Sequence, residues 1–316
     1  MLACFKFIFI YYAIMVFQRK KKEAKNRAQM EFEFPRDREN DRNFHLGGKS
    51  FYFFDLDDNV VFLSTPIVIF NKHNGAEHFL TSHQFARHNK IIGKEGLYKD
   101  YTMDFCDFNG SFRNFRDQDF SMAQRITGKR QSFVKDIEHA LNNQDHIWKA
   151  PSWNHFFHAT YNNRPVSIIT ARGHREETIR DGIDLIVKEG HLPNTPNFHT
   201  IYAVSNPETR ERLGGCREDY NVPELKYKAI IESVEKAIKE YGYSDYHRFG
   251  MSDDDPGNID LITDAMVELK QKFPRMSFFV IQTYDNGFER REVLTNEIKT
   301  IVSKSESRLD QLNLFA

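Results

Sequence analysis

The sequence predicts an α/β fold, a doubly wound parallel sheet with a large insertion after its first strand. Short apolar segments rich in β-forming residues alternate with segments of helical period, an order typical of parallel sheets with helices on both faces. The insertion is expected because residues 62–150 separate the first two strands, whereas such connections usually need only a few residues. The predicted strands are Phe51–Phe54, Val166–Ile169, Thr200–Val204, Tyr246–Met251 and Ser277–Gln282.

Amphipathic helices are expected between these strands. In one of them Ile179, Ile183 and Ile186 recur at the spacing of one helix face. Pro223 and Pro256 each stand where a first helical turn accepts proline, because the N–H that proline lacks would be unpaired there anyway. The predicted helices are Trp153–Tyr161, Arg175–Glu189, Pro223–Tyr241 and Pro256–Phe273.

The inserted segment begins with the pattern of a β-hairpin. Apolar residues at Ile67–Phe70 and His78–Leu80 flank the turn dipeptide Asn74-Gly75. Further along, Ser132–Asn142 has helical period. We expect residues 62–150 to form a cap over the strand ends; the alternative is an ordinary elaboration at the sheet edge.

This reading divides the chain into a core and terminal segments. Residues 49–61 and 151–290 form the predicted core. After it, residues 291–316 are expected to form a charged helix and a loose tail. Residues 1–48, which precede the core, form a hydrophobic and basic segment.

The hydrophobic stretch at residues 2–17 is followed by a basic run at residues 19–22. As a helix the stretch falls short of the ~30 Å hydrocarbon core of a bilayer. A short anchor with its basic flank in the cytoplasm agrees with the positive-inside rule. The alternative is that translation starts at Met30. In both cases we expect the remainder of the chain in the cytoplasm, tethered to the inner face of a membrane only if the stretch is an anchor.

Composition argues against several classes of protein. Lys and Arg number 44 against 45 Asp and Glu, so no overall basic surplus favours nucleic acid. Cys4, Cys106 and Cys216 are odd in number and far apart, which indicates neither a disulfide framework nor a zinc site.

The end of the first strand carries the strongest chemical signal. The aromatic run Phe51–Phe54 is followed by Asp55, Asp57 and Asp58. Carboxylates at the end of a buried strand are costly unless a cation lies among them. Open α/β sheets also bind their ligands at this edge. The pattern therefore predicts a Mg²⁺-dependent phosphoryl site.

Three further motifs follow in the chain. The predicted strand at Val166–Ile169 ends in Thr170-Ala171-Arg172-Gly173. Lys228 lies near the start of a predicted helix, with Lys226 as a competitor for the same role. A later strand ends in the acidic run Asp253–Asp255.

With these four motifs in this order, residues 51–282 resemble the haloacid-dehalogenase superfamily of phosphatases. The first motif of that family is an apolar strand followed by Asp-x-Asp-x-Thr/Val, and here Asn59 stands in place of the Thr or Val. The resemblance implies a Rossmann-like core. It also implies that Asp55 is the nucleophile, that Asp57 is the general acid and base, and that Thr170 and Lys228 hold the transferring phosphoryl group.

The resemblance further implies a magnesium site. Asp55 would bind Mg²⁺ through its carboxylate and Asp57 through its backbone carbonyl, and Asp253 or Asp254 would complete the set. A hard cation with oxygen ligands is what such residues prefer. Asp255 is expected to cap the helix that follows it.

The expected function is therefore Mg²⁺-dependent hydrolysis of a small phosphate monoester through an aspartyl-phosphate. Two alternatives stay open. One is a non-catalytic, membrane-tethered binding module on the same scaffold. The other is a phosphatase for nucleic-acid ends, for which Arg113, Arg116, Arg125, Lys129 and Arg130 would supply a basic groove.

Overall fold

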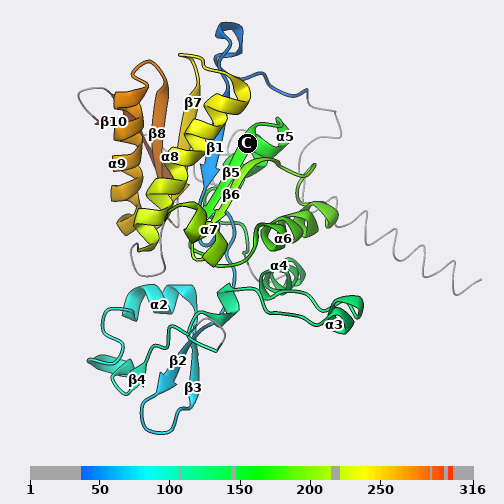
Figure 1. Ribbon diagram of the computed structural model, residues 1–316, viewed down its shortest axis with the longest axis vertical. Coiled ribbons are helices and arrows are strands. Elements are labelled where there is room, and N and C mark those ends of the chain that lie inside the picture. The colour runs from blue at the N-terminus through cyan, green and yellow to red at the C-terminus, as the bar shows by residue number, and fades with distance from the viewer. Residues whose placement is uncertain are drawn as a thin grey trace, which may run out of the picture.

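The computed structural model describes residues 37–106, 109–143, 147–214, 221–284, 287–294 and 298–301. Its main sheet has seven strands in the order β10-β9-β8-β7-β1-β5-β6 (Figure 1). Five neighbouring strands, from β8 to β6, are parallel, and β9 and β10 add antiparallel pairs at one edge. The strands are β1 Ser50–Phe54, β5 Pro165–Thr170, β6 Asn197–Ala203, β7 Arg248–Asp253, β8 Ser277–Tyr284, β9 Gly287–Val293 and β10 Ile298–Ile301.

Helices cover both faces of the sheet, as the alternating pattern predicts. Phe51 and Phe53 of β1 pack toward α8 and α9, whereas Phe54 packs in the cluster formed with α4, α5 and α6. Successive strand residues point to opposite faces, so one aromatic run serves both layers of the core. The helices are α5 Trp153–Tyr161, α6 Glu176–Lys188, α7 Pro207–Arg212, α8 Val222–Tyr241 and α9 Pro256–Lys272.

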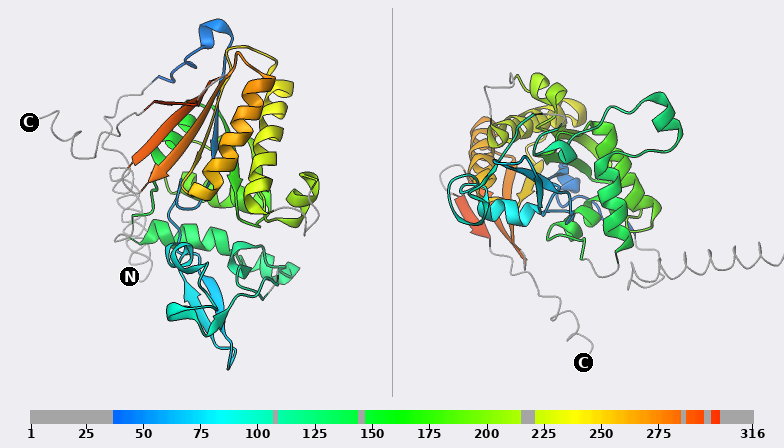
Figure 2. Two further views of the ribbon diagram at one scale, coloured as in Figure 1. Left: turned by 90° about the vertical axis from the view of Figure 1, so that its left-hand side faces the viewer. Right: turned by 90° about the horizontal axis from the view of Figure 1, so that it is seen from below.

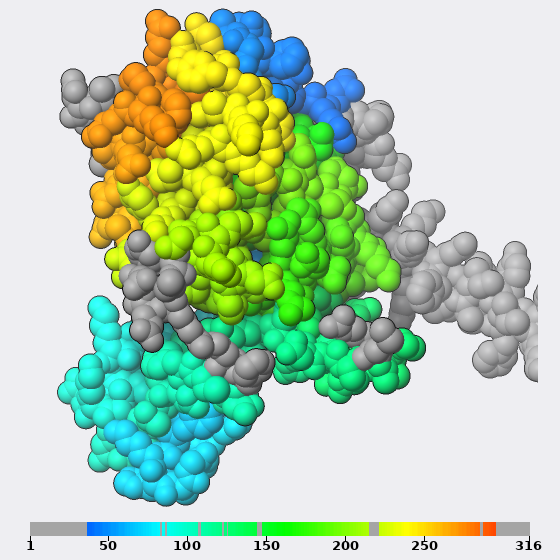
Figure 3. Space-filling model, viewed as in Figure 1, coloured from blue at the N-terminus to red at the C-terminus, as the bar shows by residue number. Residues whose placement is uncertain are grey.

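The inserted segment has two parts. Its first part, residues 67–112, forms a separate three-stranded sheet in the order β3-β2-β4, and we call it the small lobe. Figure 3 shows it as a projection in cyan and blue at one end of the molecule. Its elements are β2 Ile67–Asn71, β3 Glu77–Leu80, α2 Ser82–His88 and β4 Tyr101–Thr102, and the buried residues of its own cluster are Ile67, Ile69, Leu80, Ile92 and Tyr98.

The second part packs on the core. It contains α3 Met122–Ile126 and α4 Ser132–Asn142. Phe133 lies against Gly182 of α6 so closely that a Cβ at residue 182 would come within 2.3 Å of the ring. α4 therefore belongs to the core, and the core extends beyond the predicted boundary at residue 151. Short 3₁₀ turns occur at Phe44–Leu46, Gly96–Tyr98 and Arg113–Phe115.

The prediction of a helix after residue 290 is wrong. Residues 287–293 form β9 and residues 298–301 form β10. Their charges suggested a solvated helix, but β9 pairs with β8 from Tyr284 opposite Gly287, which completes a hairpin, and Val293 is buried in the core. In the sequence, the dipeptide Asn286-Gly287 is a typical hairpin signal at this place.

The proposed anchor at residues 2–17, its basic flank, Met30 and the tail from residue 302 lie outside the described residues. Within the described part of the chain, no helix combines the length and the apolar character needed to cross a membrane.

The parallel strands run toward the inserted segment. In Figure 1 the arrow of β1 points to the end of the molecule at which the small lobe lies, and the left view of Figure 2 shows α4 between the main sheet and that lobe. The carboxyl edge of the sheet, where open α/β sheets bind ligands, therefore lies on the side of the small lobe.

Candidate functional site

A tight loop after β1 separates the first two aspartates of the acidic run. The backbone N–H of Asp55 donates to Ser252 O at 2.9 Å, which fixes it at the end of β7. Val61 N donates back to Leu56 O at 3.0 Å, and Asp58 has φ 56°, in the left-handed region that aspartate tolerates better than most residues. The turn allows Asp55 and Asp57 to face different partners.

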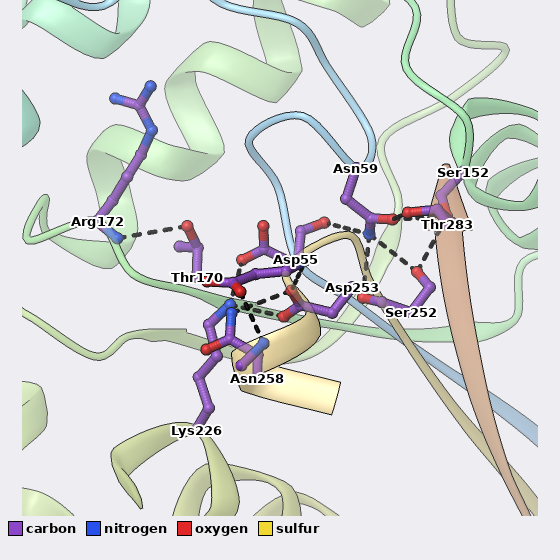
Figure 4. A network of polar contacts seen from close by, with 12 residues as sticks. Asp55, Asn59, Ser152, Thr170, Arg172, Lys226, Ser252, Asp253, Asn258 and Thr283 are labelled. Atoms are coloured by element: carbon purple, nitrogen blue, oxygen red, sulfur yellow. Dashed lines mark hydrogen bonds and ion pairs between the residues drawn. The ribbon is translucent and has the colours of Figure 1, made fainter. Parts of the chain in front are cut away.

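Asp55 faces a buried lysine. Lys226 Nζ lies 2.8 Å from Asp55 Oδ1 and 2.7 Å from Asp253 Oδ2, and all three side chains are buried (Figure 4). Burial opposes the charge on Lys226, but the carboxylates of Asp253 and Asp55 outweigh it and raise its pKa above the ordinary value. The ammonium thus joins the ends of β1 and β7.

Helix α8 places this lysine through its first turn. Asn221 caps the helix by accepting from Glu224 N at 3.0 Å, and the Glu224 side chain accepts in return from Asn221 N at 2.9 Å. Lys226 lies one turn further in, with its side chain directed to the carboxyl edge of the sheet.

The sequence prediction chose the wrong lysine of the pair. Lys228 is half-buried, and its Nζ donates to Leu213 O at 3.2 Å instead of approaching the aspartates. Two residues correspond to about 200° around an α-helix, so the two lysines point in nearly opposite directions. Lys226, the competitor in the sequence analysis, is the one at the site.

Asp55 is one of three carboxylates that lie close together. One oxygen each of Asp55, Asp253 and Asp254 lies within 4.8 Å of the others. Asp253 also accepts from Asn258 Nδ2 and from Asp255 N, each at 3.0 Å. The side chain of Asp57 is not part of this group.

The carboxylates are held at an electrostatic cost. Burial raises the pKa of Asp55 well above its usual range, Lys226 opposes that shift, and Asp253 and Asp254 add to it. The pKa of Asp254 is raised to about 7 by burial, then by Asp253 and Asp58. A divalent cation would relieve this repulsion, and an all-oxygen donor set fits Mg²⁺. The residues present thus fit the predicted metal, with both Asp253 and Asp254 in reach.

Thr170 lies beside this group. β1 and β5 pair with Phe54 opposite Ile168, so Thr170 is two residues further on, level with the loop that carries Asp55. It is fully buried, and its Oγ1 accepts from Arg172 N at 3.4 Å. Figure 4 shows Lys226 and Asp253 directed toward Asp55, with Thr170 beside them and joined to Arg172. The site thus combines side chains from the ends of β1, β5 and β7 and the start of α8.

Asp57 faces a fully buried arginine. Arg172 donates to both oxygens of Asp57, from Nε at 2.7 Å and from Nη2 at 2.6 Å. Such a two-pronged, charge-assisted pair fixes the plane of the carboxylate as well as its position. The sequence analysis did not predict that Arg172 pairs with Asp57.

Asn59, the departure from the family motif, is a buried centre of hydrogen bonds. Its Nδ2 donates to Asp55 O and Ser252 O, both at 3.0 Å, and its Oδ1 accepts from Ser152 at 2.9 Å and from Thr283 at 3.0 Å. The asparagine therefore joins the β1 loop to β7, β8 and the start of α5. Thr or Val could not make these contacts, because neither has an amide.

The residues considered for a nucleic-acid groove are mostly engaged within the protein. Arg113 pairs with both oxygens of Glu77 at 2.8 and 2.7 Å, and Arg130 lies 3.2 Å from Glu138. Lys129 lies over the ring of Phe120, 4.6 Å from its centroid. Arg116 is half-buried and lies against Gly173, and the side chain of Arg125 lies outside the described part. The geometry thus favours the acidic site over a basic groove.

No family model, no curated protein and no solved structure matches this chain.

Proposed function

We propose that this chain is a Mg²⁺-dependent phosphate monoester hydrolase that acts through an aspartyl-phosphate on a small phosphorylated substrate. One observation supports the proposal most. A buried carboxylate, Asp55, lies at the carboxyl edge of a parallel sheet among one ammonium and two further carboxylates, from Lys226, Asp253 and Asp254. A structural ion pair would not need the surplus of negative charge.

In the first step, the carboxylate of Asp55 attacks phosphorus, the bond between phosphorus and the ester oxygen breaks, and an acyl phosphate forms on Asp55. Lys226 and the hydroxyl of Thr170 would hold the transferring oxygens. Bound Mg²⁺, held by Asp55 with Asp253 and Asp254, would neutralise the charge that collects between carboxylate and phosphate.

Asp57 would act as the general acid and then as the general base. It would give a proton to the leaving oxygen in the first step. In the second it would take one from the water that attacks phosphorus, which releases phosphate and restores the carboxylate of Asp55. The small lobe, residues 67–112, would act as the cap that covers the substrate.

The test is a screen for release of inorganic phosphate from sugar phosphates, nucleotides and 3′-phosphorylated oligonucleotides, with Mg²⁺ and with EDTA. We expect release from at least one small phosphate ester with Mg²⁺ and loss of that activity in EDTA. Release from none of them would contradict the proposal and favour the non-catalytic binding module, whereas release from oligonucleotides alone would favour the nucleic-acid alternative.

A further inference from the structure

Arg172 has a second set of contacts, with the inserted segment. Its Nη2, besides donating to Asp57, donates to the hydroxyl of Thr65 at 2.8 Å. Thr65 in turn donates to Asp136 of α4 at 2.5 Å. Thr65 lies in the chain that leaves the core for the small lobe, so a continuous polar path runs from Asp57 to the inserted segment.

Aromatic rings of the inserted segment enclose the same guanidinium. Cζ of Arg172 lies 4.9 Å from the ring centroid of Phe115 and 4.8 Å from that of Phe133, distances typical of cation–π contacts. The side chain has no solvent exposure, and within the described part its Nη1 is buried without a hydrogen-bond partner. Three residues around the guanidinium, Thr65, Phe115 and Phe133, thus belong to the inserted segment.

The backbone adds a third link at this junction. Gly173 N donates to Phe115 O at 2.9 Å, and residues 116 and 173 form a parallel bridge. A Cβ at Gly173 would come within 3.1 Å of the side chain of Arg116 and of Ser205 O. The loop after β5 and the inserted segment are thus in direct contact at Arg172 and at Gly173.

We propose that Arg172 is a positioning residue that couples the placement of the inserted segment to the proton-transfer group Asp57. The inference depends on the proposed function and adds regulation to it. Both Asp57 oxygens are engaged by Arg172, so Asp57 must release one of them to reach a leaving oxygen. The contacts of Thr65, Phe115 and Phe133 set where the guanidinium lies, and hence when Asp57 is aimed at the substrate.

The sharpest test compares two esters of similar shape, 4-nitrophenyl phosphate and phenyl phosphate. Phenolate is the stronger base, so its departure needs the proton from Asp57 more. General acid catalysis typically contributes about 10²- to 10⁴-fold in rate. We therefore expect Arg172→Met to lower kcat for phenyl phosphate by at least about 10-fold more than kcat for 4-nitrophenyl phosphate, and Thr65→Val to shift the ratio in the same direction by less.

Matched controls exist at the opposite edge of the sheet. Arg164 is another buried arginine paired with an aspartate, Asp41, at 2.8 Å. Thr160 is another buried threonine, and its hydroxyl makes no hydrogen bond within the described part. Arg164→Met and Thr160→Val should change stability at most and leave the ratio of the two esters at the wild-type value.

A second readout does not depend on catalysis. Hydrogen exchange at the Gly173 amide reports the contact between the β5 loop and the inserted segment. We expect faster exchange there in Arg172→Met and in Asp57→Asn, but not in Arg164→Met.

The outcomes separate the two claims. If the wild type releases phosphate but Arg172→Met and Thr65→Val keep its ester ratio and its Gly173 exchange, the positioning role is wrong and the proposed function stands. If the wild type releases no phosphate from these esters or from any member of the screen, the proposed function fails, and the positioning role fails with it whatever the exchange shows.

Discussion

Two lysines on one helix give the sharpest comparison between single residues. Lys226 bridges Asp55 and Asp253, whereas Lys228, two residues further along α8, donates to the backbone carbonyl of Leu213. Lys226→Met leaves two buried carboxylates without their cation, and breaking such a pair costs roughly 3–5 kcal/mol. We expect this variant to lose that much stability in urea unfolding and nearly all phosphate release.

Lys228→Met is the matched control, because it makes the same chemical change on the same helix. Loss of the contacts of this half-buried side chain should cost less than about 1 kcal/mol. Equal effects of the two substitutions on unfolding and on turnover would contradict the assignment of Lys226 to the site.

A substitution of Asn59 tests whether this residue, which departs from the Thr or Val of the similar motif, stabilises the fold. Asn59→Val would leave the Ser152 and Thr283 hydroxyls and two backbone carbonyls with fewer partners in a buried place. Buried polar groups left unpaired cost about 1–3 kcal/mol each, so we expect a loss of about 2–4 kcal/mol in urea unfolding. Asn197→Val, at a half-exposed strand position, is the control and should stay within ~0.5 kcal/mol of the wild type. A wild-type stability for Asn59→Val would show that the hydrogen bonds of Asn59 are dispensable.

The raised pKa of Asp254 predicts how the stability of the metal-free protein depends on pH. This pKa is about 7 in the folded chain, against roughly 3.9 for an unfolded aspartate. Between these values only the folded state keeps the proton, so the contribution of Asp254 to stability falls as pH rises from about 4 to about 7 and is then constant. Added Mg²⁺ should therefore stabilise the protein more at pH 8 than at pH 5.

The measurement is Tm against pH for the wild type and Asp254→Asn, in EDTA and in Mg²⁺. Subtracting the variant removes the opposite trend of buried histidines such as His155, whose pKa is lowered to about 4 by burial, then by His158 and Arg290. Parallel Tm curves for the two proteins in EDTA would contradict the role of Asp254.

At the scale of elements, the inserted segment has one part that we expect to be dispensable for folding and one that we expect to be essential for it. The small lobe has its own apolar cluster, whereas Phe133, Val134 and Ile137 of α4 belong to the core. Val68 N donates to Ser111 O at 3.0 Å, so residues 69–110 can be replaced by a Gly-Gly link between neighbouring backbones. We expect that variant to keep cooperative unfolding.

Removing residues 64–146, and α4 with them, should instead abolish the folded state, because each large core side chain lost costs roughly 2–5 kcal/mol. Urea unfolding followed by circular dichroism distinguishes the two deletions. If both variants fold equally well, or neither folds, the division of the inserted segment is wrong.

Periodic elements could be predicted from the sequence, and irregular ones could not. The five parallel strands and the helices between them were confirmed with small shifts at their ends, because buried faces impose their period on the residues. β9 was missed because four charged residues, Glu289–Glu292, separate its two apolar residues, Phe288 and Val293, so the strand lacks an alternating apolar pattern. Lys228 was preferred to Lys226 because spacing alone does not fix the rotation of a helix.

At the scale of the whole molecule, the site depends on distant segments that meet at one edge. Asp55, Thr170 and Asp253 were expected there, since carboxyl ends of parallel strands share an edge, whereas Lys226 was only the competitor of Lys228. What sequence could not supply was the pairing of Asp57 with Arg172 and the network of Asn59, because these depend on side-chain geometry between segments that are remote in the chain.

The most direct test of the central claim is phosphate release by Asp55→Asn, with Mg²⁺ and the best substrate of the screen. Asparagine keeps the shape of the side chain but is a far poorer nucleophile than a carboxylate. The account predicts no measurable turnover from a variant that still unfolds cooperatively. Release of phosphate at the wild-type rate would contradict it.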